Sequence, residues 1–341
     1  MHPLTPLITE DPSAFDGRSV LITGGTGSFG QAFARRLLDR YNPKRVIIFS
    51  RDEQKHFALQ QQWRDPRLRF FVGDVRDKDR LRRAFSGVDY VFHAAAMKHV
   101  HIAEYNPIEA IRTNVDGAAH LVDAALEAGV KRVVALSTDK AVNPVNLYGA
   151  TKLCMEKLIV AANSYSGAGG TQFDLVRYGN VVGSKGSVVP LFLQQRDAGE
   201  LTVTDAAMTR FWIGMDRALD LVLLALREGL GGEVFVPKLP ACSVATLAEA
   251  IAPGLPLRAI GIRPGEKMHE VMITEDEALN VVEYAQHFVV RPNFSSWGGP
   301  KREASGAPRR FTYSSDVTYQ LSVEETRALL QEFGFLPAPR A

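Results

Sequence analysis

The sequence predicts an α/β protein in which a doubly wound parallel sheet carries a smaller, mixed C-terminal lobe. Short apolar runs rich in β-branched residues alternate with helix-like stretches through the first half of the chain, a pattern typical of parallel strands joined by crossover helices. The runs are continuously apolar, as expected for strands buried on both faces. In chain order they are SVLIT, RVIIF, RFFVG, DYVFHAAA, KRVVALS and FDLVRYG.

This alternation ends near Gly183, and frequent prolines punctuate the rest of the chain. We therefore expect the sheet domain to span residues 1–182 and a smaller lobe to span 183–341, with some segments of the second part returning to the first. Ser322 and Glu325 have the spacing of a capping box for a last helix running through Phe333. The polar stretch over residues 293–310 is interpreted as a loop.

Composition excludes several classes of protein. The chain has 341 residues, 46% of them hydrophobic and 23% charged, as in a compact globular protein. Lys and Arg total 40 against 38 Asp and Glu, and no long basic run is present, so no nucleic-acid partner is expected. The N-terminal segment combines prolines with acidic residues, and no 18 apolar residues run together, so we expect neither secretion nor membrane insertion and place the protein in the cytoplasm.

Neither cysteine nor histidine spacing indicates a metal site or a disulfide. Cys154 and Cys242 are the only cysteines and are expected to be free, buried thiols. His93, His99 and His101 lie close together, but without a matching set of carboxylates or cysteines they are interpreted as core or loop residues.

The first predicted strand leads directly into a glycine-rich turn and then into the helix FGQAFARRLLDRY. Glycines at this place allow a tight turn and let backbone N–H groups approach a pyrophosphate at the positive end of the helix. The context predicts a Rossmann-type dinucleotide site rather than a purely structural turn. The expected contacts are Gly24, Thr26, Gly27, Ser28, Phe29 and Gly30.

The end of the second strand distinguishes NADP from NAD. Ser50 and Arg51 occupy this position, and a guanidinium suits a ribose 2′-phosphate. Lys55 is a second candidate for that phosphate. NADP is therefore favoured, although Asp52 could bind a free ribose hydroxyl of NAD if the loop were shifted by one residue, and Arg51 could instead be a solvated surface charge.

Two further strand ends should border the cofactor. Asp74 and Val75 follow the third strand and are expected beside the adenine. Ala94, Ala95 and Ala96 follow the fourth strand, where small side chains leave room for the dinucleotide. The alternative for these residues is close packing at a strand end.

Tyr148 and Lys152 are four residues apart on the helix predicted after the fifth strand, so they share one face. A tyrosine with a reference pKa of about 10 must become about 3 units more acidic to serve as a base near neutrality, which corresponds to about 4 kcal/mol. Lys152 and an oxidised nicotinamide are cations that could supply this. We expect Tyr148 to remove a hydroxyl proton while hydride leaves the same carbon, the alternative being a surface pair.

The motifs TGGTGSFG, SRDE, GDVRD, HAAAMKHV, STDKAVNP, YGATK, RYGNVVGS and RPGEKMHE together resemble the inverting UDP-N-acetylglucosamine 4,6-dehydratases, a branch of the extended short-chain dehydrogenase/reductase family. The similarity runs from about Gly17 to the last helix, and STDKAVNP and RPGEKMHE are its most specific parts. It implies a lyase that retains NADP and converts UDP-N-acetylglucosamine to a 4-keto-6-deoxy sugar with inversion at C5. It also implies a homo-oligomer, hexameric or dimeric, and a role in pseudaminic acid or another surface-glycan or flagellin sugar pathway.

The resemblance also implies roles for the residues just before the tyrosine. Asp139 would be the acid that protonates the leaving C6 hydroxyl, Lys140 the base that removes the C5 proton, and Thr138 a hydrogen-bonding partner near C4. A neutral lysine requires a lowered pKa, and an ionised Asp139 opposes that change. The alternative is a solvated turn after the strand.

Contacts to the nucleotide-sugar rest mainly on the same resemblance. Arg210 and Arg263 are candidates for the diphosphate, Glu266 for holding Arg263 or a ribose hydroxyl, and Asn180 for the diphosphate or sugar. Lys98, past the fourth strand, could reach substrate or cofactor or be a surface charge. Interdomain tethers are the alternative for the others.

Three other functions stay open from the sequence. A UDP-sugar 4-epimerase would use the same tyrosine without eliminating water, and a bifunctional dehydratase/epimerase would process its own product further. A noncatalytic NADP-binding regulator would not require Asp139, Lys140, Tyr148 and Lys152 together.

Overall fold

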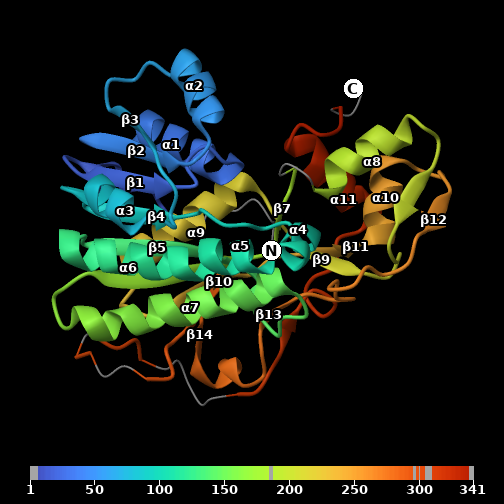
Figure 1. The fold of residues 1–341 in the computed structure, drawn as a ribbon. Coiled ribbons are helices and arrows are strands. Elements are labelled where there is room, and N and C mark those ends of the chain that lie inside the picture. Colours follow the sequence, from blue (N-terminus) through green and yellow to red (C-terminus); the bar gives the residue numbers. More distant parts are fainter. Residues whose placement is uncertain (1–6, 184–186, 295–296, 299, 304–308, 338–341) are drawn as a thin grey trace.

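The computed structural model describes residues 7–183, 187–294, 297–298, 300–303 and 309–337 (Figure 1). Its main feature is a nine-stranded sheet with the strand order β14-β15-β10-β6-β5-β4-β1-β2-β3. The strands are β1 (Ser19–Thr23), β2 (Arg45–Ser50), β3 (Leu68–Val72), β4 (Tyr90–His93), β5 (Arg132–Thr138), β6 (Gln172–Tyr178), β10 (Val234–Pro237), β14 (Val281–Glu283) and β15 (His287–Val290). The first six match the predicted runs, and the α/β class with a Rossmann-type sheet is confirmed.

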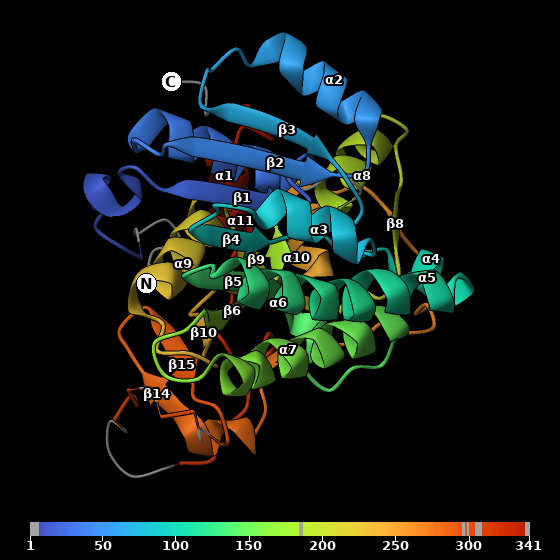
Figure 2. The same ribbon diagram turned by 60° about the vertical axis from the view of Figure 1, so that its left-hand side comes forward.

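Helices cover both faces of this sheet (Figure 2). One face packs against α3 (Lys78–Phe85), α6 (Gly117–Ala128) and α7 (Leu147–Ser166), and the other against α1 (Ser28–Arg40) and α9 (Met215–Glu228). The helix α2 (Glu53–Gln62) lies beside the edge strand β3. Because both faces are covered, every residue of β1 is buried.

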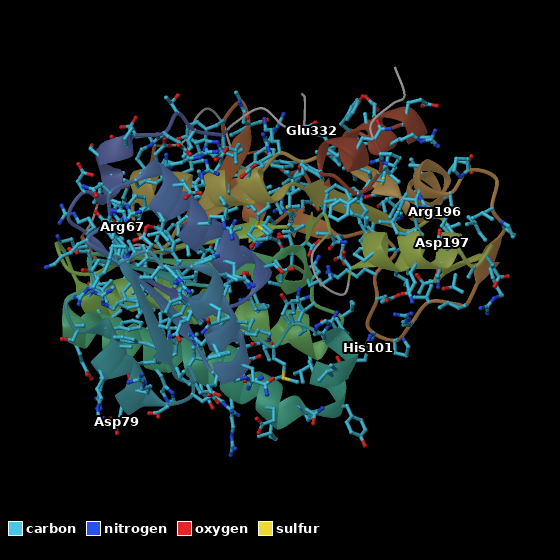
Figure 3. All side chains as sticks on the ribbon, turned by 90° about the horizontal axis from the view of Figure 1, so that it is seen from above. Arg67, Asp79, His101, Arg196, Asp197 and Glu332 are labelled. Carbon is cyan, nitrogen blue, oxygen red and sulfur yellow. The ribbon has the colours of Figure 1, made fainter. Side chains whose placement is uncertain are left out.

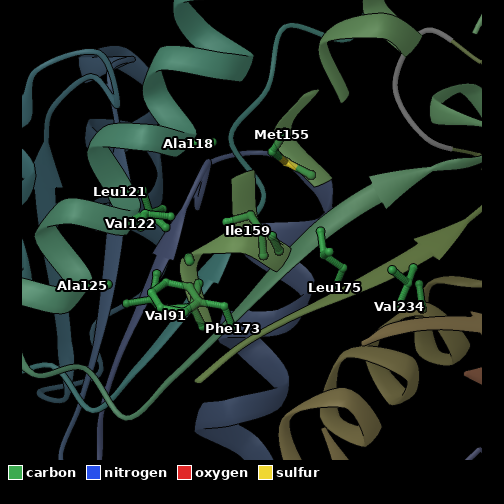
Figure 4. Packing of buried hydrophobic residues seen from close by; sticks show 14 of the residues in the cluster. Val91, Ala118, Leu121, Val122, Ala125, Met155, Ile159, Phe173, Leu175 and Val234 are labelled. Carbon is green, nitrogen blue, oxygen red and sulfur yellow. The ribbon is translucent and has the colours of Figure 1, made fainter. Parts of the chain in front are cut away.

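Successive strand residues supply the two apolar layers alternately, since neighbouring side chains of a strand point to opposite faces. In β1, Leu21 belongs to the layer under α3, α6 and α7, whereas Val20 and Ile22 belong to the layer under α1 and α9. Figure 4 shows the first layer at the middle of the sheet, where Val91 and Phe173 from the strands lie near Ile159 of α7. This packing holds the carboxyl ends of the parallel strands along one edge.

Three strands and one helix beyond residue 182 are part of the sheet domain. The strand β10 pairs parallel with β6, β15 pairs antiparallel with β10, and β14 pairs antiparallel with β15. The helix α9 packs its leucine-rich face on the same sheet. All four residues of β10 are buried, which suits a strand inside a sheet. The chain therefore crosses to the second lobe and returns.

The second lobe has an apolar core of its own, which includes Phe192, Trp212, Leu247 and Leu330. It contains helices α8 (Val188–Arg196), α10 (Val244–Ile251) and α11 (Val323–Glu332) with the strand pair β8 (Leu201–Val203) and β12 (Leu257–Ala259). Two small sheets lie at the junction with the first domain, formed by β7 (Asn180–Val181), β9 (Thr209–Ile213) and β11 (Ala241–Ser243), and by β13 (Val271–Ile273) and β16 (Tyr313–Ser314).

Short helical segments complete the described chain. They are α4 (Val100–Tyr105), α5 (Pro107–Ile111), a π-helical turn over Arg112–Asp116, and the 3₁₀ turns η1 (Pro12–Phe15), η3 (Asp139–Ala141) and η4 (Glu277–Asn280). The predicted capping box of α11 is confirmed, because Ser322 and Glu325 each bond the other's backbone N–H. Residues 295–296, 299 and 304–308 of the predicted polar loop lie outside the described residues, as do residues 1–6 of the N-terminal segment and Ser184 of the RYGNVVGS motif.

One prediction about the cysteines is wrong. Cys242 is buried as expected, but Cys154 is exposed on α7. Its position follows from the helical period, since Met155 and Ile159 take the buried face of α7 and Cys154 falls beside it. Among the described residues, no helix is long and apolar enough to cross a membrane, and no group of three or more His, Cys, Asp or Glu could hold a metal ion.

Candidate active site

A cavity of about 710 Å³ lies at the carboxyl ends of the parallel strands, the edge at which such sheets bind ligands. Every residue expected to bind the cofactor lines it, from the glycine loop and Arg51 to Ala96, Tyr148 and Lys152. Thr138, Lys140, Lys98 and Asn180 line it as well. Its wall further includes residues that sequence reasoning did not select, among them Met97, Thr113, Leu136, Ser137, Tyr178 and Met215.

The glycine loop after β1 has a shape that other residues would not permit. Gly24 has φ +66°, and a Cβ on it would lie 2.8 Å from the backbone nitrogen of Ala95. A Cβ on Gly30 would lie 2.5 Å from Cα of Gly25. The loop is thus folded tightly against itself and against the end of β4. The residues present fit a dinucleotide, because this leaves the N-terminus of α1 open to an anionic group in the cavity.

At the end of β2, the charged residues have different partners. Asp52 accepts from the backbone N–H of Lys55 (3.0 Å) as the N-cap of α2 and also pairs with the Lys55 ammonium (2.6 Å). Arg51 is 64% exposed and its Nη1 lies 3.8 Å from Asp74. Asp74 is held more closely by Arg76, at 2.7 Å. The guanidinium of Arg51 is therefore exposed and only loosely paired, so it can turn towards a ligand. The carboxylate of Asp52, in contrast, is used to cap α2.

The start of α7 is packed directly on the η3 turn. Asn146 caps the helix by accepting from the N–H of Gly149 (2.8 Å), and its amide donates to the carbonyl oxygen of Gly265 in the second lobe (2.7 Å). A Cβ on Gly149 would lie 2.0 Å from the carbonyl oxygen of Lys140. Only glycine allows this approach, which brings Tyr148, in the first turn of α7, next to the Asp139–Lys140 dipeptide.

Asp139 and Lys140 form a hydrogen-bonded pair in the turn after β5; Lys140 lines the cavity, whereas Asp139 lies behind it and is not part of the described lining. Asp139 is 0% exposed, and its Oδ1 accepts from the hydroxyl of Thr138 (2.8 Å) and from Nζ of Lys140 (3.1 Å). Among the described residues, its other oxygen, Oδ2, has no hydrogen-bond partner. Nζ of Lys140 also lies 3.4 Å from Oδ1 of Asn180. The pair is thus an acid with one unfilled oxygen beside an amine that lines the cavity.

Burial dominates the acid–base properties of these groups. It raises the pKa of Asp139, against the opposing effect of Lys140, and it raises the pKa of Tyr148 to about 12, although Lys140 and a hydrogen bond with Thr138 act to lower it. Burial alone would lower the pKa of Lys140, but two carboxylates, Asp139 and Glu270, raise it above its ordinary value. For Tyr148 and Lys140 these directions are opposite to the expectation from sequence.

Lys152 lies on the buried face of α7, as the four-residue spacing predicts. Its ammonium donates to the carbonyl oxygen of Leu136 (2.6 Å) and lies 3.0 Å from Sδ of Met155. Burial lowers its pKa to about 8, with Glu156 opposing this change. The cation that acts on Tyr148 in this structure is Lys140, from the turn after β5.

The candidates for nucleotide-sugar binding in the second lobe lie outside the described lining of the cavity. Arg210 on β9 donates to the backbone carbonyl oxygens of Thr209, Met268 and Lys267 at 2.7–3.1 Å, so it fixes the RPGEKMHE loop. Arg263 is half exposed and lies 4.0 Å from Glu266. Oε2 of Glu266 is buried and lacks a partner within the described chain.

Sequence reasoning missed Glu270, which the structure brings to Lys140, and Lys267, which pairs with Glu270. Oε1 of Glu270 lies 3.3 Å from Nζ of Lys140, and Nζ of Lys267 lies 3.7 Å from Oε2 of Glu270. Both belong to the RPGEKMHE motif, which marked the region without indicating which side chain turns towards the reacting groups. Tyr178, at the end of β6, also faces the cavity near Tyr148.

Comparison with known proteins agrees with this geometry. Residues 20–292 match the family model described as polysaccharide biosynthesis protein. A protein of Campylobacter jejuni subsp. jejuni serotype O:2 named UDP-N-acetylglucosamine 4,6-dehydratase (inverting) is 52% identical over 82% of this chain and 84% of its own length. A Rickettsia canadensis protein named UDP-glucose 4-epimerase is 38% identical over 94% of this chain and 98% of its own length.

Among solved structures, Pen from Bacillus thuringiensis superposes with a TM-score of 0.88 and 39% identity, over 95% of this chain and 99% of that chain. The agreement extends across both lobes, since so large a coverage includes the segments that leave and re-enter the sheet. The chain therefore belongs to the polysaccharide biosynthesis protein family and, within it, to the dehydratases of the extended short-chain dehydrogenase type that include the inverting UDP-N-acetylglucosamine 4,6-dehydratases, which are lyases.

Proposed function

We propose that the protein removes water from UDP-N-acetylglucosamine to form a UDP-4-keto-6-deoxy-N-acetylhexosamine with inversion at C5. The observation that carries this proposal is the contact of Asp139 with Lys140, an amine that lines the same cavity as Tyr148 and the glycine loop. An acid and an amine placed side by side suit an elimination, which needs one group to accept a proton and another to donate one.

The chain's own groups divide the proton transfers among themselves. Tyr148 takes the proton of the C4 hydroxyl, Lys140 takes the C5 proton that a C4 ketone makes acidic, and Asp139 gives its proton to the C6 hydroxyl as this leaves as water. When bound, NADP would accept hydride from C4 and return it to C6; a proton delivered to C5 on the face opposite to its removal then completes the product, with inversion and no net oxidation. Thr138 keeps the Asp139 carboxyl turned towards Lys140 through its 2.8 Å hydrogen bond.

The unfilled Oδ2 of Asp139 supports its role as the acid. Burial disfavours the ionised form of a carboxyl group that has an oxygen without a hydrogen-bond donor and only one cation nearby, and it raises the pKa of Asp139. Lys140 must lose its proton before it can serve as the base, and the charge of an oxidised nicotinamide in the cavity would favour this loss.

The direct test is the mass of the product. Incubation with UDP-N-acetylglucosamine and NADP is expected to give a nucleotide-sugar lighter by one water, and NMR in deuterated solvent is expected to show deuterium at C5 of an inverted sugar. A product of unchanged mass with altered stereochemistry at C4 would instead identify a UDP-sugar 4-epimerase. This second candidate is considered because of the similarity to the Rickettsia protein. A late change in the configuration of the first product would identify the bifunctional enzyme.

Lys140 favours the dehydratase over the epimerase. A 4-epimerase needs no base at C5, whereas here an amine lines the cavity beside the proposed acid. We further propose that the product enters a surface-glycan or flagellin sugar pathway such as that of pseudaminic acid. The homo-oligomer, hexameric or dimeric, stays a prediction.

NADP rather than NAD is the proposed cofactor, and Arg51 is the residue expected to select it. Replacing Arg51 by alanine should weaken NADP binding about 10- to 100-fold, because charge-assisted hydrogen bonds to a 2′-phosphate contribute about 1.5–3 kcal/mol, and should leave NAD affinity within about twofold. Titration with each nucleotide by fluorescence measures both constants.

The matched control for this variant is Arg196→Ala, which removes an exposed arginine at the outer side of the second lobe (Figure 3). It should leave both affinities unchanged. Equal losses for NAD and NADP in Arg51→Ala would contradict a role in reading the 2′-phosphate. Unchanged binding of both would mean that Arg51 is a solvated surface charge.

A further inference from the structure

Glu270 is a buried carboxylate of the second lobe that faces the reacting pair of the first domain. Its side chain is 3% exposed, and its Oε1 lies 3.3 Å from Nζ of Lys140. Its backbone is fixed on both sides by Ser315, whose Oγ accepts from the Glu270 N–H (2.9 Å) and whose own N–H donates to the Glu270 carbonyl oxygen (2.8 Å). The backbone that carries this carboxylate is therefore held in place independently of Lys140.

The charges around Glu270 come from four parts of the chain. Asp139 and Lys140 face it from η3, Arg210 from β9 with Nε 4.0 Å from Oε1, and Lys267 from its own loop with Nζ 3.7 Å from Oε2. Tyr148 on α7 adjoins the same pair. These groups make a compact cluster of two carboxylates and three cations in a poorly solvated place.

The two carboxylates of the cluster are not equivalent. Glu270 has three cations within 4.0 Å, whereas Asp139 has only Lys140, at 3.1 Å, among the described residues. Nearby cations favour the ionised form of a carboxyl group, and a neighbouring carboxylate favours the protonated form. Glu270 should therefore stay ionised, and a proton shared by the two should be found on Asp139. The pKa directions agree, lowered for Glu270 and raised for Asp139.

We propose that Glu270 is a positioning residue for the reaction, which holds the amine of Lys140 between the two lobes and keeps Asp139 in its proton-donating form. The inference deepens the proposed dehydration and rests on it. It gives the RPGEKMHE loop a function besides the nucleotide contacts that the resemblance implies for it, because this loop carries the carboxylate that faces Lys140 and Asp139 of the first domain.

The sign of the effect follows from charge. Glu270→Gln removes a negative charge from beside both Lys140 and Asp139, so the pKa of each should fall. The two limbs of a bell-shaped dependence of rate on pH report the pKa values of such an acid–base pair. Both limbs should therefore move to lower pH together. A residue that serves only to hold the loop in place would lower the rate without moving the limbs.

The test compares kcat for loss of water across pH in the wild type and in Glu270→Gln. Both limbs should move by about 1 pH unit towards acid, with about a 10-fold loss of kcat at the wild-type optimum and a KM changed by no more than about twofold. Lys267→Met removes a cation of the same cluster and should move the limbs in the opposite direction. Limbs that stay in place in both variants would overturn the proposal.

Glu233→Gln is the matched control. Glu233 is likewise buried and ion-paired, with Nε of Arg302 at 2.8 Å, but it immediately precedes β10, at the end of the sheet remote from the cavity. Its replacement should leave both limbs in place. A shift equal to that of Glu270→Gln would show that any lost buried carboxylate has the same effect, and would contradict a specific role for Glu270.

A measurement without turnover separates this inference from the proposed function. Trace acetylation followed by mass spectrometry gives the pH at which the Lys140 amine becomes reactive, whether or not UDP-N-acetylglucosamine is a substrate. The midpoint for Lys140 should be lower in Glu270→Gln than in the wild type and higher in Lys267→Met. An unmoved Lys140 midpoint would reject the role of Glu270, whereas absence of dehydration in the wild type alone would reject the proposed function.

Discussion

Replacing Lys140 by alanine is expected to abolish the exchange of the C5 proton and to lower the rate of water loss about 10²- to 10⁴-fold, the contribution typical of a positioned general base. Cofactor binding should be retained, because the glycine loop and Arg51 lie at other strand ends of the cavity. NMR of the nucleotide-sugar in deuterated solvent measures the exchange, and product mass measures the elimination.

Lys131→Ala is a suitable control for this variant. Lys131 precedes β5 by one residue, whereas Lys140 follows its end, and it forms an exposed ion pair with Asp89 (2.8 Å). Its loss should change the rate by less than about twofold, since surface ion pairs contribute little. Continued deuterium incorporation at C5 in Lys140→Ala would remove this lysine from the role of base and direct attention to Tyr148 or Asp139.

Tyr148→Phe should stop the reaction at an earlier point. Tyr148 is the proposed base for the C4 hydroxyl proton, so we expect loss of its phenol to lower turnover about 10²- to 10⁴-fold and to remove the transient absorbance of reduced nicotinamide. Burial holds the pKa of this phenol at about 12, so activity that depends on its deprotonation should rise towards alkaline pH until another group limits it.

Tyr165→Phe provides the comparison on the same helix. Tyr165 is 72% exposed near the C-terminus of α7, and its hydroxyl should be dispensable. If Tyr148→Phe still formed reduced nicotinamide at the wild-type rate, the C4 proton would have to leave by another path. Tyr178, which faces the same cavity, would then be the next candidate.

The residues expected to bind the cofactor and those expected to carry out the reaction differ in how narrowly they identify the enzyme's activity. A tight glycine loop before α1 and an arginine after β2 would serve many dinucleotide-dependent enzymes equally well. The turn after β5 is compatible with fewer reactions. Asp139, Lys140 and Tyr148 come together there because Gly149 allows α7 to approach the Lys140 carbonyl oxygen closely. We therefore expect the choice between dehydration and epimerisation to depend on Asp139 and Lys140, since both reactions would use Tyr148.

Much of the sheet domain could be predicted from local sequence. Continuous apolar runs identified the first six strands, since a strand covered on both faces must be apolar at every position. The glycine spacing identified the loop before α1, because backbone approach of this kind excludes side chains. The capping box of α11 was equally local, as its hydrogen bonds join residues three positions apart.

Other features depend on residues far apart in the chain. The return of β10, β15 and β14 to the main sheet could not be derived from their short apolar segments, because such segments fit either lobe. Arg210 was expected at a diphosphate, but its guanidinium is engaged by backbone carbonyl oxygens of the loop at 267–268 and of Thr209. Only the crossing of that loop over β9 brings the carbonyl oxygens of Lys267 and Met268 to this guanidinium.

The amino-acid sequence by itself determined the Rossmann-type sheet, the glycine loop and the placement of Tyr148 and Lys152 four residues apart on α7, because each depends on spacing within one or two neighbouring elements. Tertiary structure alone decided the charge around the reacting groups. Glu270, 130 positions after Lys140 in the printed sequence, lies 3.3 Å from its amine, and burial sets the pKa directions of Tyr148 and Asp139. Electrostatic effects depend on distance and solvation in space, and these exist only once both lobes have folded against each other.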